Sequence, residues 1–115
     1  TFLENDRGAI RALERNLVLL GFTGRARILR GDALRQPPPG SRFDLIFVDP
    51  PFALFEEERP RSAVIARVES LIEGALAPAG TLVFRHPASR ALEIGAPADD
   101  RRTFGGSVAL FFRRR

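Results

Sequence analysis

The sequence predicts an α/β protein whose sheet is mostly parallel and doubly wound and ends in an antiparallel hairpin. Stretches typical of strands alternate with helical patterns through most of the chain, and the last apolar stretch is expected to fold back across Gly105 and Gly106. A further observation is that acidic residues follow three predicted strands: Glu4, Asp32 and Asp49. Because the carboxyl ends of parallel strands share one edge, these acids are expected to line one cleft.

The totals restrict the class of protein. A chain of 115 residues is enough for one domain, and an apolar content of 44% argues against disorder and against a coiled coil. No apolar run approaches the roughly 20 residues of a membrane span, and no signal peptide is found, so we expect a cytoplasmic protein with no membrane partner. We also expect a monomer. The absence of Cys excludes disulfides and Cys-based metal sites.

The charge balance is basic, with a formal charge of +4 and an isoelectric point of about 11.3. Every basic residue is Arg, which contacts phosphate in a bidentate manner and stacks on bases. A polyanionic partner is therefore plausible. The alternative is a genome whose base composition favours Arg codons, and both interpretations stay open.

The first third of the chain reads as strand, helix, strand. Residues 1–5 are a short strand, Asp6 is a good helix N-cap, and Gly21 ends the helix. The apolar face of this helix is expected to hold Ile10, Leu13, Leu17 and Leu20. Residues 25–30 read as the second strand, and the proline-rich stretch 36–40 reads as a loop.

The remainder reads as strand, helix, strand and hairpin. Residues 43–49 form the third strand, an apolar run that predicts burial on both faces. Ser62 is expected to cap a helix that runs through Leu76 and ends at residues 78–80. Residues 81–85 are the fourth strand, and 86–100 carry no clear pattern. The hairpin is predicted over residues 101–104 and 107–112.

The most specific motif is Asp49-Pro50-Pro51-Phe52, directly after the third strand. The prolines force a rigid, extended exit that leaves their carbonyl groups outside any ladder. The Asp49 carboxylate and the Pro50 carbonyl could accept both hydrogens of a nucleobase amine and leave its lone pair available, while Phe52 stacks on the base. Methyl transfer from a sulfonium to such an amine needs in-line positioning above all. The alternative is a proline-rich strand exit with Phe52 in the core.

Glu4 and Asp32 are individually weaker signals. A carboxylate after a strand, like Glu4, suits a ribose diol, and Asp32 behind Gly31 suits an adenine amine. The alternatives are negative charge at a helix N-terminus for Glu4 and an Asx-turn for Asp32.

Several stretches carry a resemblance to known proteins. They are Thr1-Phe2-Leu3-Glu4-Asn5-Asp6, Asn16-Leu17, Leu20-Gly21, Gly31-Asp32-Ala33-Leu34 and Phe43-Asp44-Leu45-Ile46-Phe47-Val48-Asp49-Pro50-Pro51-Phe52. They resemble the bacterial methyltransferase family that modifies guanine N2 in small-subunit ribosomal RNA. The strand at 106–112 is similar but less specific.

The resemblance implies a Rossmann-like class I fold that uses S-adenosyl-L-methionine, with residues 1–115 as the C-terminal part of a single catalytic domain. It implies Glu4 and Asn5 at the cofactor ribose, Asp32 and Ala33 beside the adenine, and the motif that begins at Asp49 as the catalytic residues. The implied partner is small-subunit ribosomal RNA or its assembling particle. An adenine-N6 methyltransferase and an inactive or nucleic-acid-binding fragment are the alternatives.

The chain departs from this family in two ways. The Gly-rich cofactor loop and its strand should precede Thr1, so the chain is expected to be a fragment. Since that strand lies between those at Thr1 and Phe43, the sheet should be interrupted there or pair differently. An acidic residue is expected after the fourth strand, where Arg85 and His86 stand. His86 is expected to be a loop bystander, and no residue spacing suggests a metal site.

Overall fold

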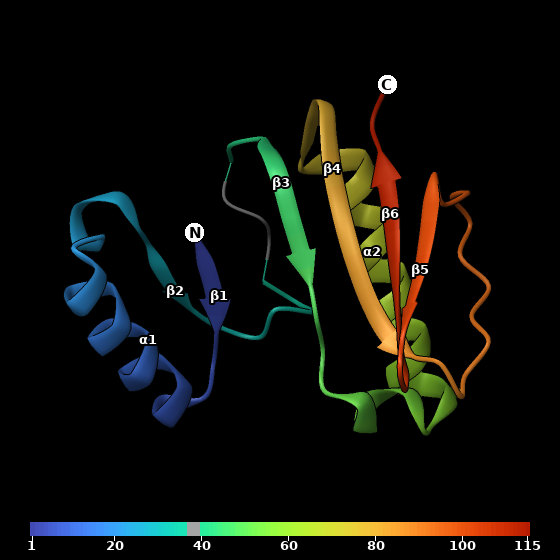
Figure 1. Ribbon diagram of the computed structural model, residues 1–115, viewed down its shortest axis with the longest axis horizontal. Helices are drawn as coiled ribbons and strands as arrows, with labels where there is room; N and C mark the ends of the chain where they lie inside the picture. Colours follow the sequence, from blue (N-terminus) through green and yellow to red (C-terminus); the bar gives the residue numbers. More distant parts are fainter. Residues whose placement is uncertain (37–39) are drawn as a thin grey trace. The chain divides into compact units, whose positions relative to one another are not determined.

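The computed structural model describes residues 1–36 and 40–115, which fall into two compact units, Thr1–Pro37 and Pro38–Arg115 (Figure 1). The predicted loop at 36–40 lies mostly outside the described residues. The strands form a two-stranded sheet in the first unit and a four-stranded sheet in the second, with no strand pairing between the two sheets in the described part. None of the described helices is long and apolar enough to cross a membrane.

The first unit contains β1 (Phe2–Glu4), α1 (Arg7–Leu20), the 3₁₀ turn η1 (Thr23–Arg25) and β2 (Ile28–Arg30). β1 and β2 are parallel, with Glu4 opposite Arg30. The predicted second strand began too early, because the residues up to Arg25 form η1.

Both predicted ends of α1 are confirmed. The Asp6 side chain accepts a hydrogen bond from the Ala9 amide at 2.7 Å, and Gly21 adopts a left-handed conformation with φ of 70°. Ile10 and Leu17 are buried as predicted. The prediction that Leu20 is a core residue is wrong, because 63% of its surface is exposed.

The second unit contains the four-stranded sheet in the order β3-β4-β6-β5. Its elements are β3 (Phe43–Val48), η2 (Phe52–Phe55), α2 (Glu58–Gly74), β4 (Leu76–Pro87), β5 (Asp100–Phe104) and β6 (Ser107–Arg113). β3 and β4 are parallel, whereas β4–β6 and β6–β5 are antiparallel, so the predicted hairpin is confirmed. In the described residues two strand pairs are parallel and two antiparallel, a more even mixture than predicted.

α2 lies against one face of this sheet, behind β4 and β6 in Figure 1. The core between them includes fully buried apolar side chains from both layers, namely Phe55, Val64, Val68, Leu82, Phe84 and Phe112. Burial of each such side chain stabilises the fold by about 1.5–3 kcal/mol before conformational entropy is counted. The end of β3 is therefore part of a sheet that is packed against a helix on one face.

Three predictions for this unit are wrong. α2 begins at Glu58 and not at a Ser62 cap, and it ends at Gly74, so that Leu76 belongs to β4. β3 is not covered on both faces, since Leu45 is 53% and Phe47 70% exposed. His86 is not in a loop, because β4 runs to Pro87 and buries it.

Candidate active site

Asp49 leaves the sheet at the carboxyl end of β3. The last paired residue of β3 is Val48, opposite Phe84 of β4. Pro51 has φ of −54° and ψ of 135°, the extended conformation that its ring favours. Its carbonyl accepts a hydrogen bond from the Leu54 amide at 3.1 Å, which begins η2. The Pro50 carbonyl, by contrast, accepts no hydrogen bond from the described residues.

Arg85 connects the two ends of this motif. Its Nε donates a hydrogen bond to Oδ1 of Asp49 at 2.8 Å, and its Cζ lies 5.0 Å from the centre of the Phe52 ring. Both side chains of the ion pair are about half exposed. The structure therefore places the Asp49 carboxylate and the Phe52 ring around one planar group, and within the described residues Oδ2 of Asp49 is not hydrogen-bonded.

A buried aromatic cluster supports Phe52. Phe55, only 1% exposed, meets Phe52 edge to face, with 6.3 Å between ring centres. Phe84 and His86 pack against Phe55 at 6.1 and 6.4 Å. Because Phe55 has a fixed place in the core, the position of the Phe52 ring is restrained as well.

His86 is part of this cluster and only 2% exposed. Burial lowers the pKa of its imidazole below the ordinary value, and the positive charge of Arg101 acts in the same direction. The hydrogen bond to the Pro87 carbonyl, 2.9 Å from Nδ1, opposes this shift. A carbonyl only accepts, so Nδ1 carries the proton in the neutral ring.

The acids of the first unit lie together at one edge of its sheet. Glu4 ends β1, Asp32 follows β2, and the Gly31 amide donates to the Glu4 carbonyl at 3.2 Å. Oε1 of Glu4 accepts hydrogen bonds from the Asn5 and Asp6 amides, each at 3.1 Å. Two of the three predicted strand ends therefore meet, while Asp49 belongs to the second unit, so that one cleft for all three acids stays a prediction.

Asp32 and its neighbours form a turn. Oδ1 of Asp32 accepts from the Leu34 amide at 2.9 Å, and Nε of Arg35 lies 3.7 Å from the other oxygen. A Cβ at Gly31 would come within 2.7 Å of the Gln36 side-chain oxygen, which is the end of a flexible side chain and can move aside. The Asx-turn considered for Asp32 is therefore present.

The chemistry of these groups fits a nucleoside with a ribose diol. Within the described residues, Oε2 of Glu4 makes no hydrogen bond, and its partner oxygen is held by two backbone amides. A fixed carboxylate with a free oxygen can accept from a ribose hydroxyl group. Glu4, Asn5, Asp32 and Ala33 belong to the first unit, and the residues from Asp49 to Phe52 belong to the second.

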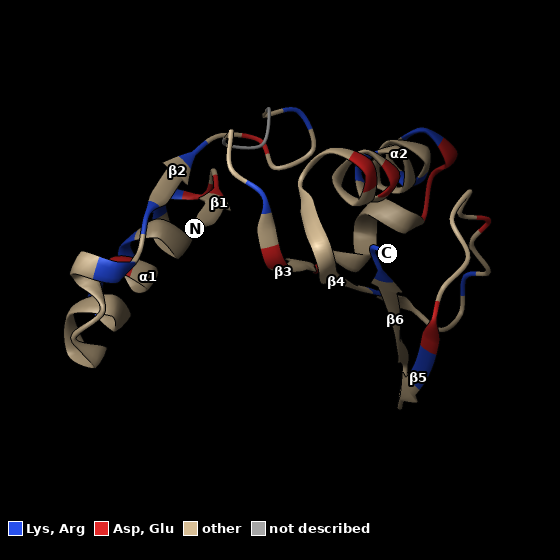
Figure 2. Ribbon diagram, turned by 90° about the horizontal axis from the view of Figure 1, so that it is seen from above, with Lys and Arg blue, Asp and Glu red and all other residues tan. Residues whose placement is uncertain are grey.

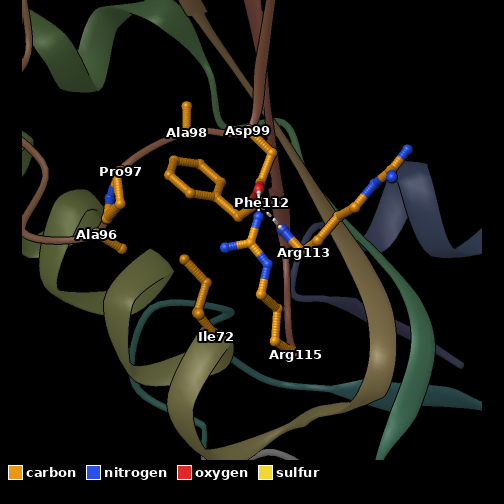
Figure 3. A pocket seen from close by; sticks show the side chains of 8 residues that line it. All are labelled: Ile72, Ala96, Pro97, Ala98, Asp99, Phe112, Arg113 and Arg115. Atoms are coloured by element: carbon orange, nitrogen blue, oxygen red, sulfur yellow. Dashed lines mark hydrogen bonds and ion pairs between the residues drawn. The ribbon is translucent and has the colours of Figure 1, made fainter.

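Two pockets are lined by none of the predicted site residues. One, of about 320 Å³, is lined in Figure 3 by Ile72, Ala96, Pro97, Ala98, Asp99, Phe112, Arg113 and Arg115. Its carboxylate, Asp99, is already bound by Nη2 of Arg115 at 2.6 Å and by the Arg113 amide at 2.7 Å. Arg113 is opposite Thr81, four residues or about 13 Å along β4 from Arg85. This pocket is therefore separate from the Asp49 motif.

The other pocket is basic. Arg7 and Arg11 of α1 and Arg30 of β2 line about 240 Å³. Figure 2 shows blue segments, which mark arginine in this chain, on both α1 and β2. None of the three takes part in an ion pair within the described residues. No group of three or more His, Asp or Glu side chains that could hold a metal ion is found in the part that the structure describes.

The sequence analysis missed the contact that Arg85 makes. The signal was present, because a parallel strand after the third one places its own end beside Asp49, and residue 85 was the predicted end of the next strand. Only the register, with Val48 opposite Phe84, shows that Arg85 and Asp49 are neighbours.

The family model described as "Conserved hypothetical protein 95" matches residues 1–112 of the chain. The chain belongs to this family. Among curated proteins, it is similar to the ribosomal RNA large subunit methyltransferase K/L of Chromohalobacter salexigens, with 45% identity over 67 residues. That match covers 52% of this chain but only 9% of the relative.

Solved structures show the same fold. The Escherichia coli protein yhhF, provisionally named a methyltransferase, has a TM-score of 0.72 and 24% identity, covering 98% of this chain and 61% of its own. The rRNA methyltransferase aviRa of Streptomyces viridochromogenes has a TM-score of 0.55 and 19% identity, covering 92% of this chain and 45% of its own. The chain therefore has the same α/β fold as these solved structures.

Proposed function

We propose that this chain contributes the catalytic residues of an S-adenosyl-L-methionine-dependent methyltransferase that modifies guanine N2 in small-subunit ribosomal RNA. The observation that carries the proposal is the arrangement at the carboxyl end of β3. There the Pro50 carbonyl is free, Asp49 keeps one free oxygen, and Phe52 rests on buried Phe55. The methyltransferase fold and the rRNA-methylating relative support the assignment.

The acceptor side of the reaction uses Asp49, Pro50 and Phe52. Two oxygens that only accept hydrogen bonds, one a carboxylate and one a carbonyl, hold both hydrogens of the guanine amine. Its nitrogen lone pair is then free to attack. Pro51 keeps the two acceptors at a fixed spacing, and Phe52 stacks on a base that has left its helix.

The cofactor side uses Glu4 and Asn5 for the ribose and Asp32 and Ala33 for the adenine. S-adenosyl-L-methionine supplies the methyl group as a reactive sulfonium. The chain's own contribution is to bind and orient, since a displacement at carbon depends on in-line placement of the amine. That residues 1–115 lie in one catalytic domain of a cytoplasmic monomer stays a prediction.

Substitution of Asp49 tests the assignment. We expect Asp49→Ala to abolish methyl incorporation into small ribosomal subunits while the affinity for S-adenosyl-L-methionine, measured by calorimetry, stays nearly the same. The matched control is Asp44→Ala, which removes an exposed carboxylate from the same strand. Normal turnover by the Asp49 variant would refute the assignment.

The target itself has two further candidates. The relative from Chromohalobacter salexigens is named for the large ribosomal subunit, which favours that subunit as an alternative substrate. An adenine-N6 target is a second alternative, because the same acceptors fit any exocyclic amine. Separating the subunits after labelling and identifying the methylated nucleoside by mass spectrometry distinguishes all three.

A binding role without catalysis is the remaining alternative. Calorimetry with S-adenosyl-L-methionine decides it, since tight saturable binding contradicts an inactive fragment. If the arginines bind RNA, the affinity must fall steeply with salt, and a flat response would exclude an electrostatic RNA surface.

A further inference from the structure

We propose that Arg85 competes with the target base for one binding site. This site, the Asp49–Phe52 clamp, consists of the Asp49 carboxylate, the Pro50 carbonyl and the Phe52 ring. In this proposal, which rests on the proposed function, the guanidinium and a base with an exocyclic amine are mutually exclusive occupants of the same two contacts. Arg85 is thus a positioning and specificity residue that a base must displace.

The first argument is chemical likeness. A guanidinium is a planar group that donates N–H bonds and stacks on aromatic rings, and an amino-substituted base is the same in both respects. Arg85 makes both contacts, with Nε 2.8 Å from Oδ1 of Asp49 and Cζ 5.0 Å from the Phe52 ring centre. These are the carboxylate and the ring assigned to the target base. Although Oδ2 of Asp49 is left free, the guanidinium lies over the ring on which the base would stack.

The second argument is that the two cannot be accommodated together. Phe52 is already in contact with Phe55, whose position in the core is fixed, so the ring cannot turn freely to offer another face. The Pro50-Pro51 segment is equally restricted in φ. A base that stacks on Phe52 and donates to Asp49 therefore needs the space of the guanidinium.

The third argument is that displacement is inexpensive. The Arg85 and Asp49 side chains are 49% and 53% exposed, so solvent screens their attraction, and the ring contact is likewise at the surface. Exposed contacts of these two kinds together correspond to about a 3- to 20-fold effect on binding. A group held this weakly excludes poor ligands yet yields to a base with two good donors.

Binding of 2-aminopurine riboside tests the proposal without methyl transfer. This nucleoside carries the same 2-amino group as guanosine and has no phosphate to bind the other arginines. Its fluorescence is quenched when it stacks on a ring, so quenching reports binding. The chain has no Trp or Tyr, so protein emission does not interfere. Arg85→Met keeps much of the side-chain stem while removing the charge and the donors, and it is expected to bind the nucleoside about 5-fold more tightly than the wild type.

Two controls give readouts that a purely structural role would not produce. Arg90→Met removes an exposed arginine from the turn after β4 and should leave the affinity unchanged. Raising salt from about 50 mM to about 500 mM weakens an exposed ion pair. Salt should therefore tighten binding to the wild type and have no such effect on Arg85→Met. Circular dichroism verifies that each variant is folded.

The possible results test the competition by Arg85 separately from the existence of the clamp. If Arg85→Met binds no more tightly than the wild type while Phe52→Ala loses binding, the competition is refuted and the clamp stands. If Phe52→Ala and Asp49→Ala bind as well as the wild type, or no protein binds the nucleoside, the clamp is refuted and the competitor with it. Tighter binding by Arg85→Met that is lost again on adding Phe52→Ala supports both.

Discussion

The buried imidazole of His86 predicts a pH dependence of stability that one substitution should remove. His86→Phe keeps an aromatic ring among Phe55 and Phe84 and deletes the titrating group. His86 is the only histidine of the chain, so no other imidazole titrates in the same range. The experiment therefore isolates one side chain.

The sign follows from the lowered pKa of His86. Above the unfolded-state pKa of about 6.5, both states hold a neutral ring and stability is at its full value. As the pH falls through about 6.5, the unfolded chain takes up a proton that the folded chain resists, so stability declines until the folded-state pKa is reached. One proton gives a slope of at most about 1.4 kcal/mol per pH unit.

The variant should behave differently at both ends of this range. It loses the hydrogen bond from Nδ1 to the Pro87 carbonyl, which costs about 1 kcal/mol near pH 8. Its free energy of unfolding should then stay level as the pH falls below about 6.5, so that the difference between the two curves narrows. Urea unfolding followed by far-UV circular dichroism measures both curves. Equal slopes for wild type and variant below about pH 6.5 would show that burial of His86 does not oppose its protonation.

Two further predictions concern the backbone. Asp6→Ala removes the cap on the Ala9 amide and should destabilise α1 by about 1 kcal/mol, seen as reduced helicity; an unchanged spectrum would contradict the capping role. Gly80→Ala places a Cβ 2.8 Å from the Ala77 carbonyl oxygen and should cost about 1–3 kcal/mol, whereas Gly24→Ala meets no atom within 4 Å and should change unfolding by less than about 0.5 kcal/mol. Equal effects of the two glycine substitutions would refute the steric argument.

Local signals explain which elements could be predicted. Both ends of α1 were correct because Asp6 and Gly21 act through hydrogen bonds and φ angles within a few residues of themselves. The start of α2 was wrong because Ser62 was taken as its cap, whereas the helix begins at Glu58 and includes Pro60. This proline lies in the first turn of the helix, where a missing N–H loses no intrahelical bond.

The exit from α2 was mispredicted for a related reason. Pro78 and Gly80 are typical of a helix end, but the helix has ended at Gly74 and these residues form an irregularity within β4. The register between β3 and β4 shifts there, and Ala79 takes a positive φ of 62°. Pairing with β3 and β6 decides this conformation, and such long-range pairing cannot be seen in a local pattern.

In the candidate site, too, the local features could be predicted and the long-range contacts could not. The rigid exit from Asp49 to Phe52 could be predicted, because two prolines determine it locally. The ion pair with Arg85 joins residues 36 positions apart. The aromatic support of Phe52 comes from Phe55 of η2, which packs in turn on Phe84 and His86 of β4. Sequence reasoning therefore identified the groups of the clamp but not the group that competes for it.

The clamp's preference for donors follows from the chemistry of its oxygens. The Pro50 carbonyl can only accept, and an ionised Asp49 can only accept, so a base edge that presents carbonyl oxygens would leave both without partners. Leaving an acceptor without its donor discriminates against the wrong ligand, and the half exposure of Asp49 reduces this penalty. Guanine, adenine and cytosine satisfy this requirement through their amines and uracil does not, whereas the Arg85 guanidinium donates to Asp49 and leaves the Pro50 carbonyl without a partner among the described residues. The competition proposed for Arg85 is thus a direct consequence of a site built from acceptors alone, because any such site in an arginine-rich chain attracts its own side chains before it meets a base.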